Sequence, residues 1–220
     1  MPGRTLAIGD IHGCDVALLT LLPTLALRAD DTLVVLGDAI DRGPGSRQVV
    51  ERLLRLAEEC RLVFILGNHE EMLLDTLAGA GSLEAWLRYG GMETLASYGG
   101  DLRKVPVAHS EFLQSGLDYW ETGSELFIHA NLEPGVALES QPPEWLRWTH
   151  LSGFEVPHPS GKRIVCGHTP QKNGLPLTLD GWACIDTYAC GTGWLTCLDV
   201  GTNQIFQANA LGQTRSGSLA

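Results

Sequence analysis

Short apolar segments alternate with helical patterns at the start of this chain, and that alternation is the feature that most restricts its fold. Residues 5–9, 32–37 and 62–67 are rich in Val, Ile, Leu and Phe and end at glycine, which is typical of buried strands. Residues 15–27, interrupted by a proline, and 47–59 show helical periodicity between them. This order, in which three strands alternate with two helices, predicts a parallel sheet that is covered by helices.

The rest of the chain changes character twice. Residues 70–120 carry helical patterns that paired glycines interrupt, so we expect a helical insertion there. Strands dominate afterwards, at 125–130, 163–167, 183–186, 195–200 and 204–208. We therefore predict an α/β (α+β) fold of two packed mixed sheets flanked by helices. It would form a single domain over 1–211, followed by a flexible C-terminal tail at 212–220 of small polar residues.

Composition excludes several classes of function. The 220 residues carry a formal charge of −11, which is a poor match for nucleic acid or for an anionic membrane. No apolar run approaches the roughly 20 residues of a transmembrane helix. The N-terminus lacks a signal-peptide pattern, so we expect a cytoplasmic protein with reduced cysteines. The oligomeric state stays open, and a monomer is compatible with the sequence.

Charged clusters follow five of the predicted strands. Functional groups collect at the carboxyl ends of strands in layered α/β folds, so these clusters are expected to converge on one pocket. Flanking glycines let the chain turn sharply away from each strand. The clusters are Gly9-Asp10-Ile11-His12-Gly13, Gly37-Asp38-Ala39-Ile40-Asp41-Arg42-Gly43, Gly67-Asn68-His69-Glu70, His129, and Gly167-His168-Thr169.

The side chains in these clusters form a coherent set of metal ligands. Carboxylate, amide and imidazole groups suit Mn²⁺, Fe or Zn²⁺ and lack the all-oxygen character that Ca²⁺ prefers. Six such groups are too many for one zinc ion and fit two divalent ions, with Mn²⁺ as our first choice. The six are Asp10, His12, Asp38, Asn68, His129 and His168.

Three neighbouring residues predict phosphoryl chemistry beside the metals. Two metals together lower the pKa of a water molecule and hold the oxygens of an in-line displacement at phosphorus. Arg42 would bind phosphoryl oxygens through its planar cation. His69 follows a predicted ligand and would protonate the leaving oxygen, with Asp41 orienting its ring. His109, His150 and His158 are expected to be exposed loop residues.

The motifs GDIHG, GDAIDRG, GNHE, the His129 strand and GHT, in this order, resemble the metallophosphoesterase superfamily. GNHE is similar to the PPP-type serine/threonine phosphatase branch, and the compact length resembles its small bacterial and phage members. The resemblance runs from about Leu6 to Leu198. It implies a calcineurin-like fold with four layers, α-β-β-α, and direct attack on phosphorus by a hydroxide that bridges two metals.

The resemblance also assigns roles to residues. It implies that Asp10 and His12 hold one metal, that Asp38 bridges, and that the other three ligands hold the second metal. The catalytic residues would be His69, Asp41 and Arg42, and the substrate-binding residues Arg42, Arg147 and Asn68. Arg147 matches a second phosphate-clamping arginine of the family.

Three functions are open at this point. The first is a phosphomonoesterase that acts on phosphoserine or phosphothreonine in a phosphoprotein or phosphopeptide, with phosphotyrosine also open. The enzymatic alternative is symmetrical hydrolysis of dinucleoside polyphosphates such as diadenosine tetraphosphate, with Tyr188 and Trp194 available to stack on adenine. The third is a metal-bound interaction scaffold without catalysis.

Overall fold

A six-stranded sheet is the centre of the fold. The computed structural model describes residues 3–219. The strand order is β11-β10-β9-β1-β2-β3, in which β1, β2 and β3 are parallel and the other three join antiparallel. The strands are β1 (Thr5–Ile8), β2 (Thr32–Val35), β3 (Arg61–Phe64), β9 (Leu195–Asp199), β10 (Gln204–Ala208) and β11 (Thr214–Ser218).

A five-stranded mixed sheet packs against the first. Its order is β4-β5-β6-β8-β7, with β5, β6 and β8 parallel and an antiparallel strand at each edge. The strands are β4 (Tyr119–Glu121), β5 (Glu125–Ile128), β6 (Arg163–Cys166), β7 (Leu177–Leu179) and β8 (Trp182–Cys184). All strands expected from the sequence are present, while β4, β7 and β11 were not expected.

Alternation along the strands explains how both faces of the first sheet are filled. Leu6 and Ile8 of β1 face the helices, whereas Ala7 faces the second sheet, where it packs in one cluster with Phe127 and Val165. The outer face of the second sheet is covered by a third apolar cluster from the segment that follows β5. The predicted fold of two mixed sheets between helical layers is therefore confirmed.

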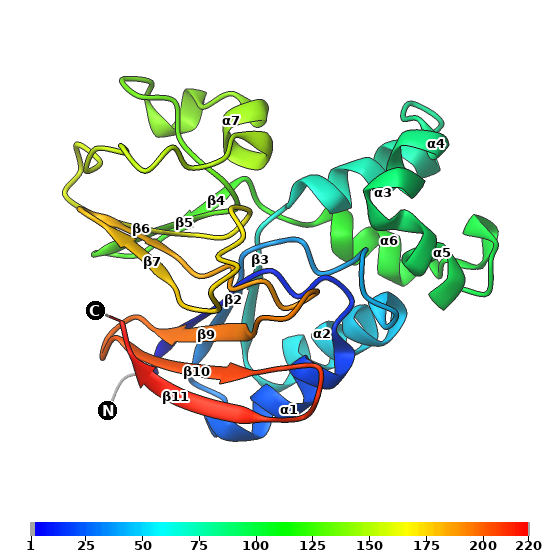
Figure 1. Cartoon of the computed structure of the whole chain (residues 1–220). Coiled ribbons are helices and arrows are strands. Elements are labelled where there is room, and N and C mark those ends of the chain that lie inside the picture. Colours follow the sequence, from blue (N-terminus) through cyan, green and yellow to red (C-terminus); the bar gives the residue numbers. More distant parts are fainter. Residues whose placement is uncertain (1–2, 220) are drawn as a thin grey trace.

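The helices gather in two groups (Figure 1). α1 (Asp15–Leu25) and α2 (Ser46–Glu59) cover the first sheet, and the helices of the expected insertion lie together at the right of the view, away from the second sheet. The insertion comprises α3 (Asn68–Ala78), α4 (Leu83–Trp86), the π-turn η1 (Leu87–Gly91), α5 (Met92–Ser97), η2 (Leu102–Lys104) and α6 (Val107–Gln114). Two short elements, η3 (Leu138–Ser140) and α7 (Pro143–Trp148), lie in the segment after β5.

Three local expectations need correction. The tail at 212–220 is not flexible throughout, because Thr214–Ser218 pairs with β10 as an exposed edge strand. Asn209 closes that hairpin by accepting hydrogen bonds from the backbone of Leu211 and Gln213. α1 passes through its proline and ends at Leu25. His109 is not exposed: it lies buried on α6, hydrogen-bonded to the Tyr98 hydroxyl at 2.8 Å.

Buried Asp31 ties the start of the chain to the loop before β2. Arg4 and Arg28 donate to its carboxylate, with shortest side-chain distances of 2.6 and 2.9 Å. Burial alone would raise the pKa of Asp31, but these hydrogen bonds outweigh it and lower that pKa below its ordinary value. No helix within residues 3–219 is both long enough and apolar enough to cross a membrane.

Candidate metal centre

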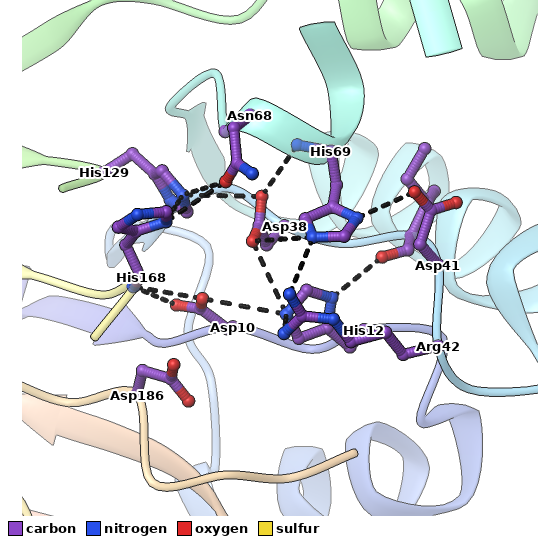
Figure 2. A network of polar contacts seen from close by, with 12 residues as sticks. Asp10, His12, Asp38, Asp41, Arg42, Asn68, His69, His129, His168 and Asp186 are labelled. Carbon is purple, nitrogen blue, oxygen red and sulfur yellow. Dashed lines mark hydrogen bonds and ion pairs between the residues drawn. The ribbon is translucent and has the colours of Figure 1, made fainter. Parts of the chain in front are cut away.

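The six predicted ligands meet where the parallel strands of both sheets end (Figure 2). Asp10 and His12 follow β1, and Asp38 follows β2. Asn68 is the first residue of α3, while His129 follows β5 and His168 follows β6. All are buried except His168, which is half-buried. Convergence of strand ends thus brings together residues up to 158 positions apart.

Asp38 stands between two groups of donor atoms. Its Oδ2 is 3.4 Å from Nε2 of His12, and its Oδ1 is 3.4 Å from Nε2 of His129. In each of two groups of side chains, the potential ligand atoms lie within 4.8 Å of one another: His12, Asp38 and His69 in one, and Asp38, His129 and His168 in the other. Because each carboxylate oxygen serves a different group, this placement suits a bridging ligand.

Backbone carbonyls fix the proton on each of the three imidazole rings. Nδ1–H of His12 donates to Ile40 at 3.0 Å, and Nδ1–H of His129 donates to Leu36 at 2.7 Å. Nε2–H of His168 donates to the carbonyl of Trp148 at 3.0 Å. The remaining ring nitrogen of each histidine therefore turns an unshared electron pair toward the centre, which is the state that binds metal.

The lone pairs of His129 and His168 crowd together with the side-chain oxygen of Asn68, with no proton between them. Nε2 of His129 is 3.2 Å from Nδ1 of His168 and 3.1 Å from Oδ1 of Asn68. Burial lowers the pKa of His129, and it lowers that of His168 to about 3, so neither ring relieves the crowding by protonation. A cation would satisfy all of these acceptors at once. The donor set therefore fits divalent metal, and its nitrogen and oxygen composition is compatible with Mn²⁺, Fe or Zn²⁺.

Asp10 closes the other side of the cluster. Its carboxylate accepts from the backbone N–H of His168 at 3.0 and 3.1 Å. A Cβ atom on Gly167 would lie 2.0 Å from Oδ1 of Asp10, so only glycine permits this approach. Burial and the nearby charges of Asp186 and Asp38 raise the pKa of Asp10 well above its ordinary value. A bound cation would offset these charges and favour the ionised carboxylate.

A buried hydrogen-bond network orients His69. Its Nδ1–H donates to Oδ2 of Asp41 at 2.8 Å, and the same carboxylate accepts from Trp86 Nε1 at 2.9 Å and from the Thr94 hydroxyl at 2.7 Å. Burial disfavours the charged form of His69, but Asp38 and the bond to Asp41 outweigh burial and raise its pKa. This arrangement is suitable for holding a transferable proton on Nε2.

Arg42 lies across the mouth of this cluster. Its guanidinium nitrogens lie 2.9 Å from Nε2 of His12 and 3.0 Å from Nε2 of His69, and each can donate only while that ring nitrogen carries no proton. Its backbone N–H donates to the carbonyl of Gly90 at 2.9 Å, and a Cβ on that glycine would lie 2.7 Å from Cγ of Arg42. Gly90 of the helical insertion therefore makes room for the arginine.

Arg147 is held in a different set of contacts. Its guanidinium is paired with Glu71 at 2.8 Å and with Asp118, and its side chain is about 10 % exposed. Nε of Arg147 is buried without a hydrogen-bond partner within residues 3–219. Its predicted role as a phosphate clamp stays a prediction, and that role would require it to exchange at least one of these carboxylates for the substrate.

Glu70 supports the loop that carries Asp38. Its carboxylate accepts from the backbone N–H groups of Asp38 at 2.8 Å and Ala39 at 2.9 Å, and from Gly67 at 3.1 Å. Burial, together with the charge of Asp38, raises the pKa of Glu70 to about 8. The Glu of the GNHE motif thus shapes the ligand loop rather than contacting substrate.

Several residues that support the site were not expected from the sequence. Asp186 lies beside Asp10 in Figure 2, and burial raises its pKa to about 6. Ser46 is the first residue of α2, and its hydroxyl accepts from the backbone N–H of Asp41 at 3.0 Å. Trp86 and Thr94 bind Asp41 from the insertion. The only indication of these residues in the sequence was the presence of polar residues within otherwise apolar segments.

Comparisons with known proteins agree with this geometry. The family model described as "Calcineurin-like phosphoesterase" matches residues 3–172. Proteins from Burkholderia pseudomallei (strain 668) and Burkholderia mallei (strain SAVP1), both named "Bis(5'-nucleosyl)-tetraphosphatase, symmetrical", are 35% identical over 138 residues, which is 61% of this chain and 45% of theirs. The chain thus spans less than half the length of these relatives.

Solved structures share the fold at low identity. A structure titled as a putative diadenosine tetraphosphatase has a TM-score of 0.69 at 21% identity, covering 99% of this chain and 96% of its own. A cold-active protein-tyrosine phosphatase from Shewanella has a TM-score of 0.67 at 18% identity, covering 98% and 80%. A serine/threonine phosphatase from Saccharomyces cerevisiae has a TM-score of 0.60 at 17% identity, covering 90% and 73%.

Proposed function

The chain belongs to the calcineurin-like phosphoesterase family, and from that premise we propose that it hydrolyses dinucleoside polyphosphates symmetrically with two divalent metal ions. One observation carries the choice of substrate: the curated relatives that match over 138 residues are named as symmetrical bis(5'-nucleosyl)-tetraphosphatases. The sequence favoured a protein phosphatase first and this activity as the alternative. The relatives support the alternative better, so the order is reversed here.

The ligand cluster supports the hydrolytic chemistry. Asp10 and His12 would hold one ion, Asn68, His129 and His168 the other, and Asp38 both, with Mn²⁺ preferred over Fe and Zn²⁺. Two such ions supply Lewis acidity toward the phosphoryl oxygens and the attacking water.

The chain's own residues complete the reaction. Arg42 would donate both arms of its guanidinium to phosphoryl oxygens, which fixes the phosphorus atom and offsets its developing charge. As water oxygen bonds to phosphorus, the bond to the leaving oxygen breaks, and His69 would give that oxygen the proton on Nε2. Asp41 would keep Nδ1–H of the same ring in place throughout. A nucleoside diphosphate is a weakly basic leaving group, so it needs this proton less than an alkoxide does.

Protein phosphatase activity remains a second candidate, with a phosphoprotein or phosphopeptide as partner. It is favoured by the order of motifs around GNHE and by the titles of two structures that share the fold. An alkoxide leaving group would make fuller use of the pair formed by His69 and Asp41.

Initial rates on the Mn²⁺-loaded protein test the proposal. We expect kcat/KM for diadenosine tetraphosphate to exceed that for a serine-phosphorylated peptide at least tenfold, about 1.4 kcal/mol of discrimination, with adenosine diphosphate as the sole nucleotide product. A tenfold preference for the peptide, or unequal products, would overturn it. Asp38→Asn is the control and should lose both activity and bound metal. No turnover of either substrate with metal bound would support the scaffold hypothesis.

A further inference from the structure

A second cavity lies beside the metal centre, on the outer face of the second sheet. Its volume is about 650 Å³, within the range of small-molecule sites. Ile164 of β6 and Trp182 of β8 belong to its lining, together with Trp145 of α7 and Phe154 of the irregular segment after it. We refer to this cavity, lined by residues of 131–159 and these two strands, as the side pocket.

The side pocket adjoins the metal centre at His150. The ring of His150 stacks on the ring of His168 with centroids 4.4 Å apart and an interplanar angle of 20°, and His150 also lines the side pocket. Asn131, two residues after His129, lines the pocket too and donates to the carbonyl of His150 at 3.2 Å. One stacked imidazole ring therefore lies between the metal ligand His168 and this pocket.

Ile164 and Trp182 are buried at the base of the pocket, whereas Phe154 and the half-buried Trp145 leave aromatic surface accessible. Phe154 is 89% exposed, an unusual state for a phenylalanine. Nε1–H of Trp182 already donates to the carbonyl of Val156 at 2.9 Å, so this indole has no free donor to offer a ligand. Stacking on aromatic rings is how proteins bind bases without reading their sequence.

The charged residues that line the pocket favour a base over a phosphate group as its occupant. Its lining includes no lysine or arginine but does include Glu133 and Glu155. The carboxylate of Glu155 is bound by Ser152 and Gly153, whereas within residues 3–219 the carboxylate of Glu133 accepts no hydrogen bond. A free carboxylate repels phosphate and accepts from the exocyclic amino group of a purine.

We propose that the side pocket binds the base of a nucleoside whose phosphate chain lies at the metal centre. This rests on the proposed function, because it names where one end of the dinucleoside substrate binds. His150 lies between the metal centre and the aromatic side pocket, so the two are close enough for one ligand to contact both. The occupant is a purine nucleoside, since its flat ring matches the accessible indole of Trp145 and the phenyl group of Phe154, and its amino group matches Glu133.

Direct binding of a nucleoside without phosphates tests the pocket independently of catalysis. Adenosine is titrated into the full chain, without added metal, by ligand-observed NMR, with ribose 5-phosphate as the baseless comparison. We expect adenosine to bind and ribose 5-phosphate not to bind. Phe154→Ala should weaken adenosine binding at least threefold, and Ala137→Trp, whose bulk would occupy part of the cavity, should weaken it at least tenfold. Leu211→Ala removes a similarly exposed apolar side chain outside the pocket and should change nothing.

Kinetics then link the pocket to the substrate. The ratio of kcat/KM for diadenosine tetraphosphate to that for p-nitrophenyl phosphate should fall at least fivefold in Phe154→Ala and stay constant in Leu211→Ala. If adenosine binds in the expected pattern but only p-nitrophenyl phosphate is hydrolysed, the pocket stands and the proposed function fails. If adenosine does not bind, or binds both pocket variants like the wild type, the pocket assignment is overturned even when the tetraphosphate is a substrate.

Discussion

Asp41→Asn tests whether His69 acts as a proton donor. Asp41 is fully buried and receives Nδ1–H of His69 at 2.8 Å. Its φ of +70° is left-handed, a conformation that asparagine adopts at least as readily as aspartate, so the backbone should be preserved. The substitution removes the negative charge behind the imidazole and leaves the shape of the side chain.

The expected effect depends on the leaving group. A hydrogen bond to a charged group contributes about 1.5–3 kcal/mol, which corresponds to roughly 10- to 100-fold in rate where the imidazolium must be stabilised. We expect a loss of that size in kcat/KM for an alkyl phosphate. The loss for p-nitrophenyl phosphate should be less than about threefold, because its leaving group needs little protonation.

The assay compares the two esters at equal metal occupancy, with thermal midpoints to show that the variant is folded. Trp86→Phe is the matched control, since it removes another donor to Oδ2 of Asp41 and keeps the charge. It should lower stability without changing the ratio of the two rates. Equal slowing of both esters by Asp41→Asn would refute the proton-donor role of His69.

Three further predictions concern the support of the site and of the fold. Glu70→Gln turns an amide N–H₂ toward backbone N–H groups, and we expect about 2 kcal/mol lower stability and at least tenfold weaker metal binding, measured by denaturation and metal titration. Gly167→Ala should displace Asp10 and lower metal content by about one ion per chain, measured by elemental analysis of the purified protein. Asp31→Asn should cost about 2 kcal/mol at pH 7. Because the folded-state pKa of Asp31 is depressed, its contribution is complete above the unfolded pKa of about 4 and is lost below it, so urea unfolding should show the two proteins converging as the pH falls.

The sequence was sufficient to predict that the six proposed ligands lie together. Each follows a strand closely, and the carboxyl ends of parallel strands share one edge of a sheet, so a one-dimensional pattern specified a three-dimensional cluster. The fold followed from the same alternation of strands and helices. Their roles as ligands stay predictions until metal content is measured on variants.

The residues that support the ligand cluster could not be predicted from local sequence patterns. Trp86 lies 45 residues from Asp41, and Thr94 lies 53 residues from it. Both are in short helices whose periodicity indicates only a buried face. Whether a buried tryptophan packs against aliphatic side chains or donates to a carboxylate depends on which loop lies opposite, and helical periodicity carries no such information.

Backbone strain explains why this site needs such supports. Left-handed φ values occur at His12 (+47°), Asp38 (+48°), Arg42 (+67°) and His168 (+62°), as well as at Asp41. Each costs a non-glycine residue of order 1–3 kcal/mol and persists only where the surroundings determine it. The carboxylate of Glu70 accepts from the backbone of Asp38 and holds it in this conformation, and the carbonyl of Gly90 does the same for Arg42. These residues are therefore as necessary to the geometry of the centre as the side chains proposed to touch metal.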